Sequence, residues 1–191
     1  MKISDSLITL RAPEPSDLDA LFRHENAPES PDSTTVMAPV SRRMLERYIE
    51  NYSADIDETG SLRFMIDLTE TGETVGSVDI YDFSARDRRG FVAIFVEERY
   101  RRRGVASHAL SLLSAYAFGP LGAHQLAAEV SAGNEASRAL FEKAGYKTCG
   151  RLRSWLRVGR RFIDVILYQK LNGDSTSWAA VSRSRSACRD G

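Results

Sequence analysis

The sequence has little of several features that mark specialised classes of protein. Its 191 residues include two cysteines, Cys149 and Cys188, which are too few for a disulfide framework and lack the spacing of a zinc site. No apolar run is long enough to cross a bilayer, and the first residues match neither a signal peptide nor a transit peptide. These absences predict a cytoplasmic protein with free thiols, no metal site and no membrane contact.

The chain also has no net charge, because its 26 Lys and Arg residues balance its 26 Asp and Glu residues. The balance is uneven: residues 1–60 hold twelve acidic and six basic side chains, so the remainder has six excess positive charges. This distribution favours a cationic acceptor and a polyanionic cofactor, with ordinary solvated helix faces as the alternative explanation. A nucleic-acid partner is not expected, since the one short basic cluster, residues 99–103, lacks interleaved exposed aromatic side chains.

Alternating and helical patterns of apolar residues predict one α/β (α+β) domain over residues 1–171. Residues 172–191 have no periodic apolar face and are predicted to form a disordered tail. The predicted order, β-α-α-β-β-β-α-β-α-β-β, indicates a mixed sheet of about seven strands with about four helices. The strands are expected over residues 7–11, 62–68, 76–83, 90–96, 125–130, 146–152 and 161–170, and the helices begin near Leu18, Ser41, Gly104 and Asn134.

The clearest pattern is a buried strand that leads directly into a helix. Residues 90–96 are all apolar or small, residues 97–103 are rich in Arg and Glu, and helical spacing begins at Gly104. The first N–H groups of such a helix have no intrahelical partner and lie at the positive end of its dipole. This arrangement suits a phosphate or pyrophosphate, and a solvated basic turn before an ordinary helix is the alternative.

Two motifs in the sequence, one in this region and one farther along the chain, resemble motifs of the GNAT superfamily of N-acetyltransferases. Arg101 to Ala106, RRRGVA, resembles the family signature (Gln/Arg)-x-x-Gly-x-(Gly/Ala), which implies a seat for the pyrophosphate of acetyl-CoA. Residues 129–146 resemble the family's strand, Asn-x-x-Ser helix and Gly-aromatic block, which implies that Asn134 bonds the pantetheine arm. The resemblance implies a GNAT-like, mostly antiparallel sheet and these acetyl-CoA-binding residues: Phe95, Val96, Arg101, Arg102, Arg103, Gly104, Val105, Ala106, Ser107, Asn134, Ser137, Phe141 and Lys143.

A third group of segments resembles one branch of that family. Residues 76–83 and 88–90, with the segment 155–164, are similar to polyamine acetyltransferases and to ribosomal-protein N-terminal alanine acetyltransferases. The resemblance implies transfer of an acetyl group to a primary amine, with a polyamine or another small amine favoured. A protein N-terminus is the alternative acceptor, and a homodimer is compatible with this interpretation.

The reaction requires a neutral amine, so a base or a chain of water molecules must remove its proton. The thioester carbonyl needs a hydrogen-bond donor, which a splayed central strand would supply through a backbone N–H near Phe95 or Val96. Asp79, on the preceding strand, matches an acidic family position and is the candidate catalytic residue, with a solvent-facing strand residue as the alternative.

Two departures from the family pattern affect the predicted chemistry. Phe141 stands where many members have the Tyr that protonates the leaving thiolate, and residues 90–96 contain no carboxylate. The three histidines, His24, His108 and His124, are scattered, and none is assigned to catalysis. These departures keep a non-catalytic CoA-binding regulatory module open as a second function.

Overall fold

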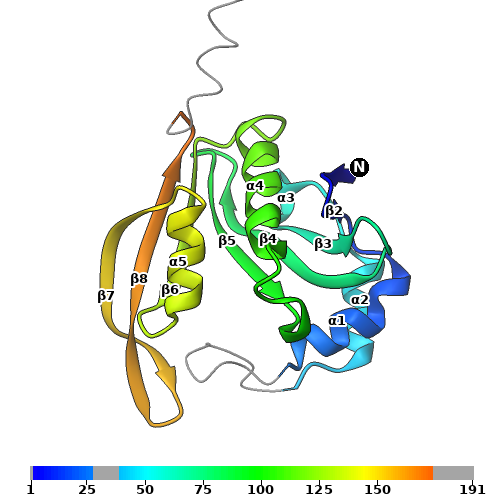
Figure 1. Cartoon of the computed structure of the whole chain (residues 1–191), viewed down its shortest axis with the longest axis horizontal. Coiled ribbons are helices and arrows are strands. Elements are labelled where there is room, and N and C mark those ends of the chain that lie inside the picture. The colour runs from blue at the N-terminus through cyan, green and yellow to red at the C-terminus, as the bar shows by residue number, and fades with distance from the viewer. Residues whose placement is uncertain (1, 28–38, 174–191) are drawn as a thin grey trace, which may run out of the picture.

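The computed structural model describes residues 2–27 and 39–173, which form one sheet with helices on both faces (Figure 1). The eight strands lie in the order β1-β2-β3-β4-β5-β6-β8-β7. Every neighbouring pair is antiparallel except β5 and β6, so the predicted mixed, mostly antiparallel sheet is confirmed. The strands are β1 (Lys2–Ser4), β2 (Ile8–Arg11), β3 (Leu62–Leu68), β4 (Thr74–Ser84), β5 (Arg89–Val96), β6 (Gln125–Ser131), β7 (Lys147–Val158) and β8 (Arg161–Leu171).

The helices divide between the two faces of this sheet. On one face, α4 covers a core that includes alternate residues of β3, β4 and β5, such as Phe64, Val78 and Val92. On the other face, α1 and α2 enclose a smaller core with Met65 of β3. The helices are α1 (Leu18–Glu25), α2 (Arg42–Glu50), α3 (Ile56–Thr59), α4 (Val105–Phe118) and α5 (Glu135–Lys143), with 3-10 turns η1 (Pro15–Asp17) and η2 (Glu98–Tyr100).

The structure adds short elements to the predicted order. Three-residue β1 and four-residue α3 are too short to show a period in the sequence. The strand expected to end at Leu152 continues to Val158, because a shift of register between Leu152 and Leu156 carries it past Ser154, whose φ is +49°. The hairpin turn near Val158 and Gly159 lies where it was predicted.

The end of the domain lies slightly beyond the predicted boundary. Asn172 donates its side-chain N–H groups to the carbonyl oxygens of Phe118 and Ala123, at 3.2 and 3.1 Å. Asn172 therefore belongs to the folded domain rather than to the tail. The rest of the predicted tail, residues 174–191, and the middle of the loop between α1 and α2 lie outside the described residues.

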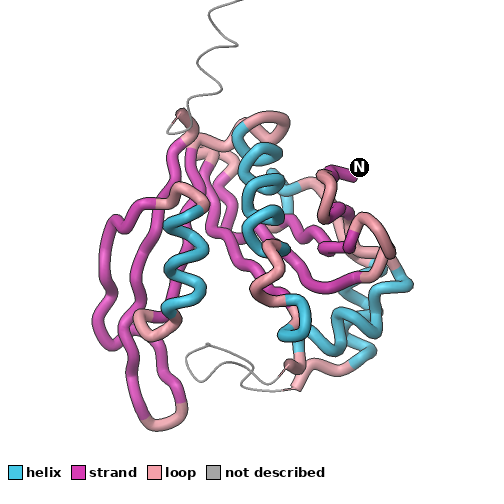
Figure 2. Tube along the Cα trace, in the orientation of Figure 1, coloured by secondary structure: helices cyan, strands magenta, loops and turns pink. Residues whose placement is uncertain are grey.

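The two central strands separate along their length. Arg89–Phe91 of β5 pairs with Gln125–Ala127 of β6, and beyond these three pairs the register between the two strands ends. Each strand stays paired on its other side, β5 with β4 as far as Val96 and β6 with β8 as far as Ser131. The sheet therefore opens toward the C-terminal ends of β5 and β6, and Figure 2 shows the two groups of strands separating there.

Candidate functional site

The separation leaves backbone polar groups of β5 facing the opening. The Glu97 N–H donates to the Val75 carbonyl oxygen at 2.9 Å, so at this residue the donor faces β4. N–H groups alternate in direction along a strand, so Phe95 also directs its N–H toward β4, whereas Val96 directs its N–H toward β6. Of the two residues expected to supply the donor, Val96 is the one whose N–H faces the opening.

Contacts on both sides hold the end of β5 in place. The Arg101 Nε donates to the Val96 carbonyl oxygen at 3.0 Å, which ties the strand to the loop that leads into α4. The Phe95 side chain points to the opposite face of the sheet and packs against His24 of α1, with 4.8 Å between the ring centroids. The position of the Val96 N–H is thus fixed by contacts that Val96 and its neighbour Phe95 make with the loop before α4 and with α1.

The predicted phosphate loop ends at the first turn of α4. Arg102 has φ +60° and Gly104 has φ +85°, so two left-handed residues reverse the chain just before the helix. The first i to i−4 hydrogen bond runs from the His108 N–H to the Gly104 carbonyl oxygen, at 3.0 Å. The N–H groups of residues 105–107, predicted to bind the cofactor, come before this bond and have no intrahelical acceptor. Side chains 101–103 are exposed around them.

On the other side of the opening, Asn134 caps α5. Its side-chain oxygen accepts the Ser137 N–H at 3.0 Å, as its role at a helix N-terminus requires. Because that oxygen is occupied, the side-chain NH₂ is the group of Asn134 that remains for a ligand. The structure therefore places Asn134 and Ser137 together, on the far side of the parted strands from Val96.

A groove of about 500 Å³ runs between α4 and α5. Ser107 and Lys143, both predicted to bind the cofactor, line it together with Ser111, Ser114 and Lys170. The buried Ser114 Oγ lies next to the Tyr146 hydroxyl, so the polar groups that the groove offers to a ligand are those of Ser107, Ser111 and Lys143. Hydroxyl and ammonium groups on the walls suit an anionic ligand that carries hydroxyls, which fits the nucleotide part of CoA.

Phe141 lies in the core rather than on the groove surface. Its side chain is 3% exposed, with its ring edge-on to Tyr146 at 5.1 Å and stacked with Tyr168 at 6.3 Å between centroids. These contacts favour a packing role for the ring. The contact of Phe141 with the thioester sulfur, which the family pattern implies, stays a prediction.

Asp79 does not face solvent as an isolated strand residue. It accepts two hydrogen bonds from Arg63, from Nε at 2.8 Å and from the second terminal nitrogen at 3.0 Å, and Arg63 also bonds Glu25 at 2.6 Å. Burial raises the pKa of Asp79, and the Arg63 guanidinium opposes that shift. Asp79 is therefore a half-buried carboxylate on the α1 and α2 face of the sheet, in an ion-pair network.

His24 is a residue of the site that the sequence did not reveal. Its Nε2 lies 3.1 Å from Glu97 Oε1, and its ring packs on Phe95, so it touches both neighbours of Val96. Burial would raise the pKa of Glu97, but hydrogen bonds from His24, Arg99 and Arg23 outweigh it and hold the pKa below its usual value. The ionised carboxylate accepts, so Nε2 of His24 carries the proton. A separation of 73 residues between the partners hid this pair in the sequence.

The buried imidazole of His24 also has an unused atom. Its Nδ1 is buried and has no hydrogen-bond partner among the described residues. Burial lowers the pKa of His24, with the Glu97 hydrogen bond acting against that shift, so the ring is neutral near pH 7. An unpaired buried nitrogen costs about 1–3 kcal/mol, so the imidazole is held here at some expense in stability.

The remaining predictions concern membrane spans, metal sites and the two cysteines, and the structure bears on them only over the residues that it describes. None of the described helices is long and apolar enough to span a membrane. In the ranges 2–27 and 39–173, no cluster of His, Cys, Asp and Glu has the arrangement needed to hold a metal ion. Cys149 is an exposed free thiol, and Cys188 lies outside those ranges.

The fold and this geometry agree with a comparison of the sequence with protein families. Residues 8–147 match the model of an acetyltransferase (GNAT) domain. The match covers well over half of the chain, and the chain belongs to the GNAT acetyltransferase family. The family resemblance drawn from residues 101–106 and 129–146 is thereby confirmed.

Individual relatives place the chain within this family without fixing its substrate. It is 29% identical over 108 residues to the uncharacterized N-acetyltransferase YoaA of Bacillus subtilis, over 56% of this chain and 61% of that protein. The aligned part thus spans less than two thirds of that relative.

Two solved structures share the fold at low identity. One is a chimera of the spermidine N-acetyltransferase SpeG from Vibrio cholerae and hSSAT, with a TM-score of 0.80, 20% identity and coverage of 90% of this chain and 99% of that chain. The other is the ribosomal L7/L12 α-N-protein acetyltransferase RimL in complex with coenzyme A, with a TM-score of 0.81, 14% identity and coverage of 92% and 100%. Both predicted branches are thus represented among the structural neighbours.

Proposed function

We propose that this chain is an acetyl-CoA-dependent N-acetyltransferase that moves the acetyl group to a primary amine. The observation that carries the proposal is the parting of β5 and β6, with the Val96 N–H facing the opening beside the N-terminus of α4. Acetyl-CoA supplies the thioester and the leaving thiolate. Residues 104–107 bind its pyrophosphate through backbone N–H groups, and the Asn134 NH₂ donates to the pantetheine arm.

In this site the Val96 N–H stabilises negative charge on the thioester carbonyl oxygen during attack by the amine. The His24 ring, the Arg101 Nε and the Glu97 N–H hold Val96 in place, so the donor is oriented before the substrate binds. Such preorganisation is what makes a backbone donor effective, because no reorganisation is required at the moment of reaction.

Asp79 is the proposed base, acting directly or through water. Its raised pKa makes it a better proton acceptor near neutral pH than an ordinary carboxylate, while Arg63 keeps it ionised. The attacking amine approaches from the α1 and α2 face, where Asp79 and the Phe95 side chain lie. An Asp79→Asn variant that keeps the wild-type pH profile of kcat/KM would contradict this role.

The favoured acceptor from the family resemblance is a polyamine or another small amine, with a protein N-terminus as the alternative. The test is release of free thiol from acetyl-CoA in the presence of spermidine, small primary amines and peptides with a free N-terminus, with the acetylated product identified by mass. We expect release that depends on the amine. Calorimetric binding of CoA without thiol release for any amine would support a non-catalytic CoA-binding module instead. A homodimer stays a prediction, which light scattering checks.

A further inference from the structure

The β7–β8 hairpin projects past the end of the sheet at which β5 and β6 part (Figure 1). Val165 of β8 pairs with Ser131, the last residue of β6, so residues 158–163 extend beyond the C-terminal end of β6. Because β5 runs parallel to β6, Val96 lies at that same end. A molecule that approaches the opening from this end therefore passes the hairpin.

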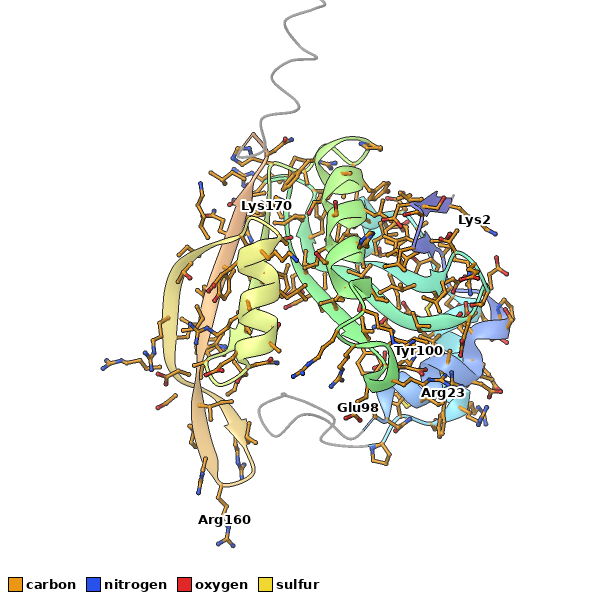
Figure 3. The ribbon with its side chains drawn as sticks, viewed as in Figure 1. Lys2, Arg23, Glu98, Tyr100, Arg160 and Lys170 are labelled. Carbon is orange, nitrogen blue, oxygen red and sulfur yellow. The ribbon has the colours of Figure 1, made fainter. Side chains whose placement is uncertain are left out.

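The projecting hairpin is strongly basic. Residues 151–163 contain five arginines, Arg151, Arg153, Arg157, Arg160 and Arg161, and no acidic residue. Among them, Arg151 bonds Asp164 through Nε at 2.7 Å, and Arg160 points away from the body of the protein at the hairpin tip (Figure 3). We call these five arginines, with Trp155 and Phe162, the basic hairpin.

Two large aromatic side chains accompany the arginines. Trp155 is 56% exposed and Phe162 is 62% exposed, and Phe162 pairs across the hairpin with Arg157. Exposed aromatic and arginine side chains together are the residue types that interfaces favour. Unlike the basic cluster at residues 99–103, this second basic segment has exposed aromatic side chains among its arginines.

The ion-pair network that contains the proposed base has the opposite sign of charge. Glu25, Arg63 and Asp79 form one network with two negative charges and one positive charge, on the face where the amine approaches. An acceptor is therefore met by a slight negative charge at its amine and by a strong positive charge farther out. A polyamine is positive along its whole length, so it is attracted by the Glu25, Arg63 and Asp79 network and repelled by the basic hairpin.

We propose that the acceptor is the N-terminal amine of a polypeptide with acidic residues a few positions along its chain, which dock on the basic hairpin. This inference rests on the proposed acetyl transfer and narrows its acceptor. A polypeptide is favoured over a nucleic acid because the reaction needs an aliphatic primary amine at the opening, which a nucleic acid lacks. Arg161 lies four residues along β8 from Val165, roughly 13 Å past the end of β6, so the acidic residues are placed a few positions after the amine.

The test compares two peptides with the same first three residues, one with Glu at positions 4–7 and the other with Gln, by thiol release at saturating acetyl-CoA. We expect kcat/KM about tenfold higher for the Glu peptide at low salt, with the advantage shrinking as salt screens the charges. Spermidine is expected to be the poorer acceptor. Equal rates for the two peptides, or spermidine as the best acceptor, would overturn the proposal.

A pair of charge-reversing substitutions in the hairpin distinguishes docking on the hairpin from an effect of the overall charge of the protein. In Arg153→Glu/Arg160→Glu we expect the preference for the Glu peptide to vanish, with the rate on the Gln peptide unchanged. The matched control, Lys2→Glu/Arg86→Glu, makes the same change of charge at exposed positions away from the hairpin and should keep the preference, since Lys2 is on edge strand β1 and Arg86 is in the turn between β4 and β5. Loss of preference in the control, or a hairpin variant that keeps it, counts against the docking site. Absence of thiol release from the wild type with every amine would instead refute the proposed function.

Two other occupants of the basic hairpin give different results. If the hairpin binds a second copy of this chain, the Arg153→Glu/Arg160→Glu variant changes the mass measured by light scattering. If it binds RNA, an RNA oligonucleotide binds the wild type tightly and the two peptides react equally. Either result overturns the proposal, and an unchanged mass with a lost peptide preference supports it.

Discussion

The two parts of the sheet on either side of the β5–β6 pair contribute different things to the site. Strands β1–β5 with α1–α4 form most of the buried core, and their polar groups are tied into networks such as Arg63 with Glu25 and Asp79. Strands β6–β8 with α5 end in an exposed basic hairpin. In the proposed function, the first part holds the reacting groups in fixed positions, while the second supplies the Asn134 cap and the charged surface that the proposed acceptor meets first.

The largest effect is expected from a glycine substitution in the loop before α4, which belongs to the first part of the sheet. In Gly104→Val a β-branched side chain at φ +85° strains the loop, and its Cβ lies 3.6 Å from the His108 ring and 3.7 Å from the Leu7 side chain, so we expect the backbone N–H groups at the start of α4 to move. We expect the KM for acetyl-CoA to rise at least about tenfold, since 1.4 kcal/mol of lost binding is tenfold. Gly72→Val is the control, because Gly72 has φ +70° in a turn with nothing within 4 Å of the added Cβ. Calorimetry that finds normal CoA binding in Gly104→Val would refute the phosphate-loop assignment.

The next comparison tests whether α1 positions the end of β5. In His24→Leu the unpaired Nδ1 and the bond to Glu97 both disappear, so we expect an unchanged or higher Tm together with a kcat about tenfold lower. The KM for acetyl-CoA should stay the same, because the pyrophosphate contacts are intact. His24→Gln, whose amide N–H reaches toward Glu97, should recover part of kcat. A loss of Tm and kcat together in both variants would indicate a merely structural role.

His24 also predicts a pH dependence of stability. Its pKa in the folded state is below the ordinary value of 6.5, so the unfolded chain binds this proton more readily. The contribution of His24 to stability is therefore complete above about pH 6.5 and is lost as the pH falls below that value. We expect the Tm of the wild type, relative to His24→Gln, to drop between pH 7.5 and pH 5.5. A constant difference across this range would show that His24 is not held neutral by burial.

A smaller effect is expected at Phe141, on the other side of the opening. The ring is buried between Tyr146 and Tyr168, so the hydroxyl of Phe141→Tyr must find a partner in the core or cost about 1–3 kcal/mol. We expect a lower Tm with kcat within about threefold of wild type. A rise of kcat toward ~10²-fold would instead show that the ring borders the thiolate and that its protonation limits the rate.

The smallest effect is expected at the end of the chain. Asn172 is bonded to Phe118 and Ala123, so a truncation that keeps Gly173 preserves these contacts. We expect its Tm and kcat to match those of the full chain, because the sequence beyond Gly173 has no periodic apolar face. A truncation that also removes Asn172 is the comparison and should have a lower Tm. Equal Tm values for the two truncations would show that the Asn172 bonds contribute nothing.

Much of the fold was predictable because its long elements carry clear periods. The buried strand 90–96, the helix after Gly104 and the cap at Asn134 each show in a local pattern, and the motif spacing then predicts one family. The pairs His24–Glu97 and Arg63–Asp79 were not predictable, since they join elements far apart in the sequence and depend on strand register. The surroundings of Phe141 were not predictable either. The helical pattern indicates which face of the helix is buried, but not which aromatic rings pack against that face.

In the proposed mechanism the opening between β5 and β6 holds the acetyl thioester against the Val96 N–H. Two-dimensional amide NMR of the ¹⁵N-labelled chain, titrated with acetyl-CoA and with CoA, tests it directly. Acetyl-CoA should move the Val96 amide proton downfield relative to CoA, because only the thioester offers a carbonyl there, while the Phe95 amide, which faces β4, should shift little. A Val96 resonance that is the same with both ligands, or a shift centred on Phe95, would contradict the role of Val96 as the donor.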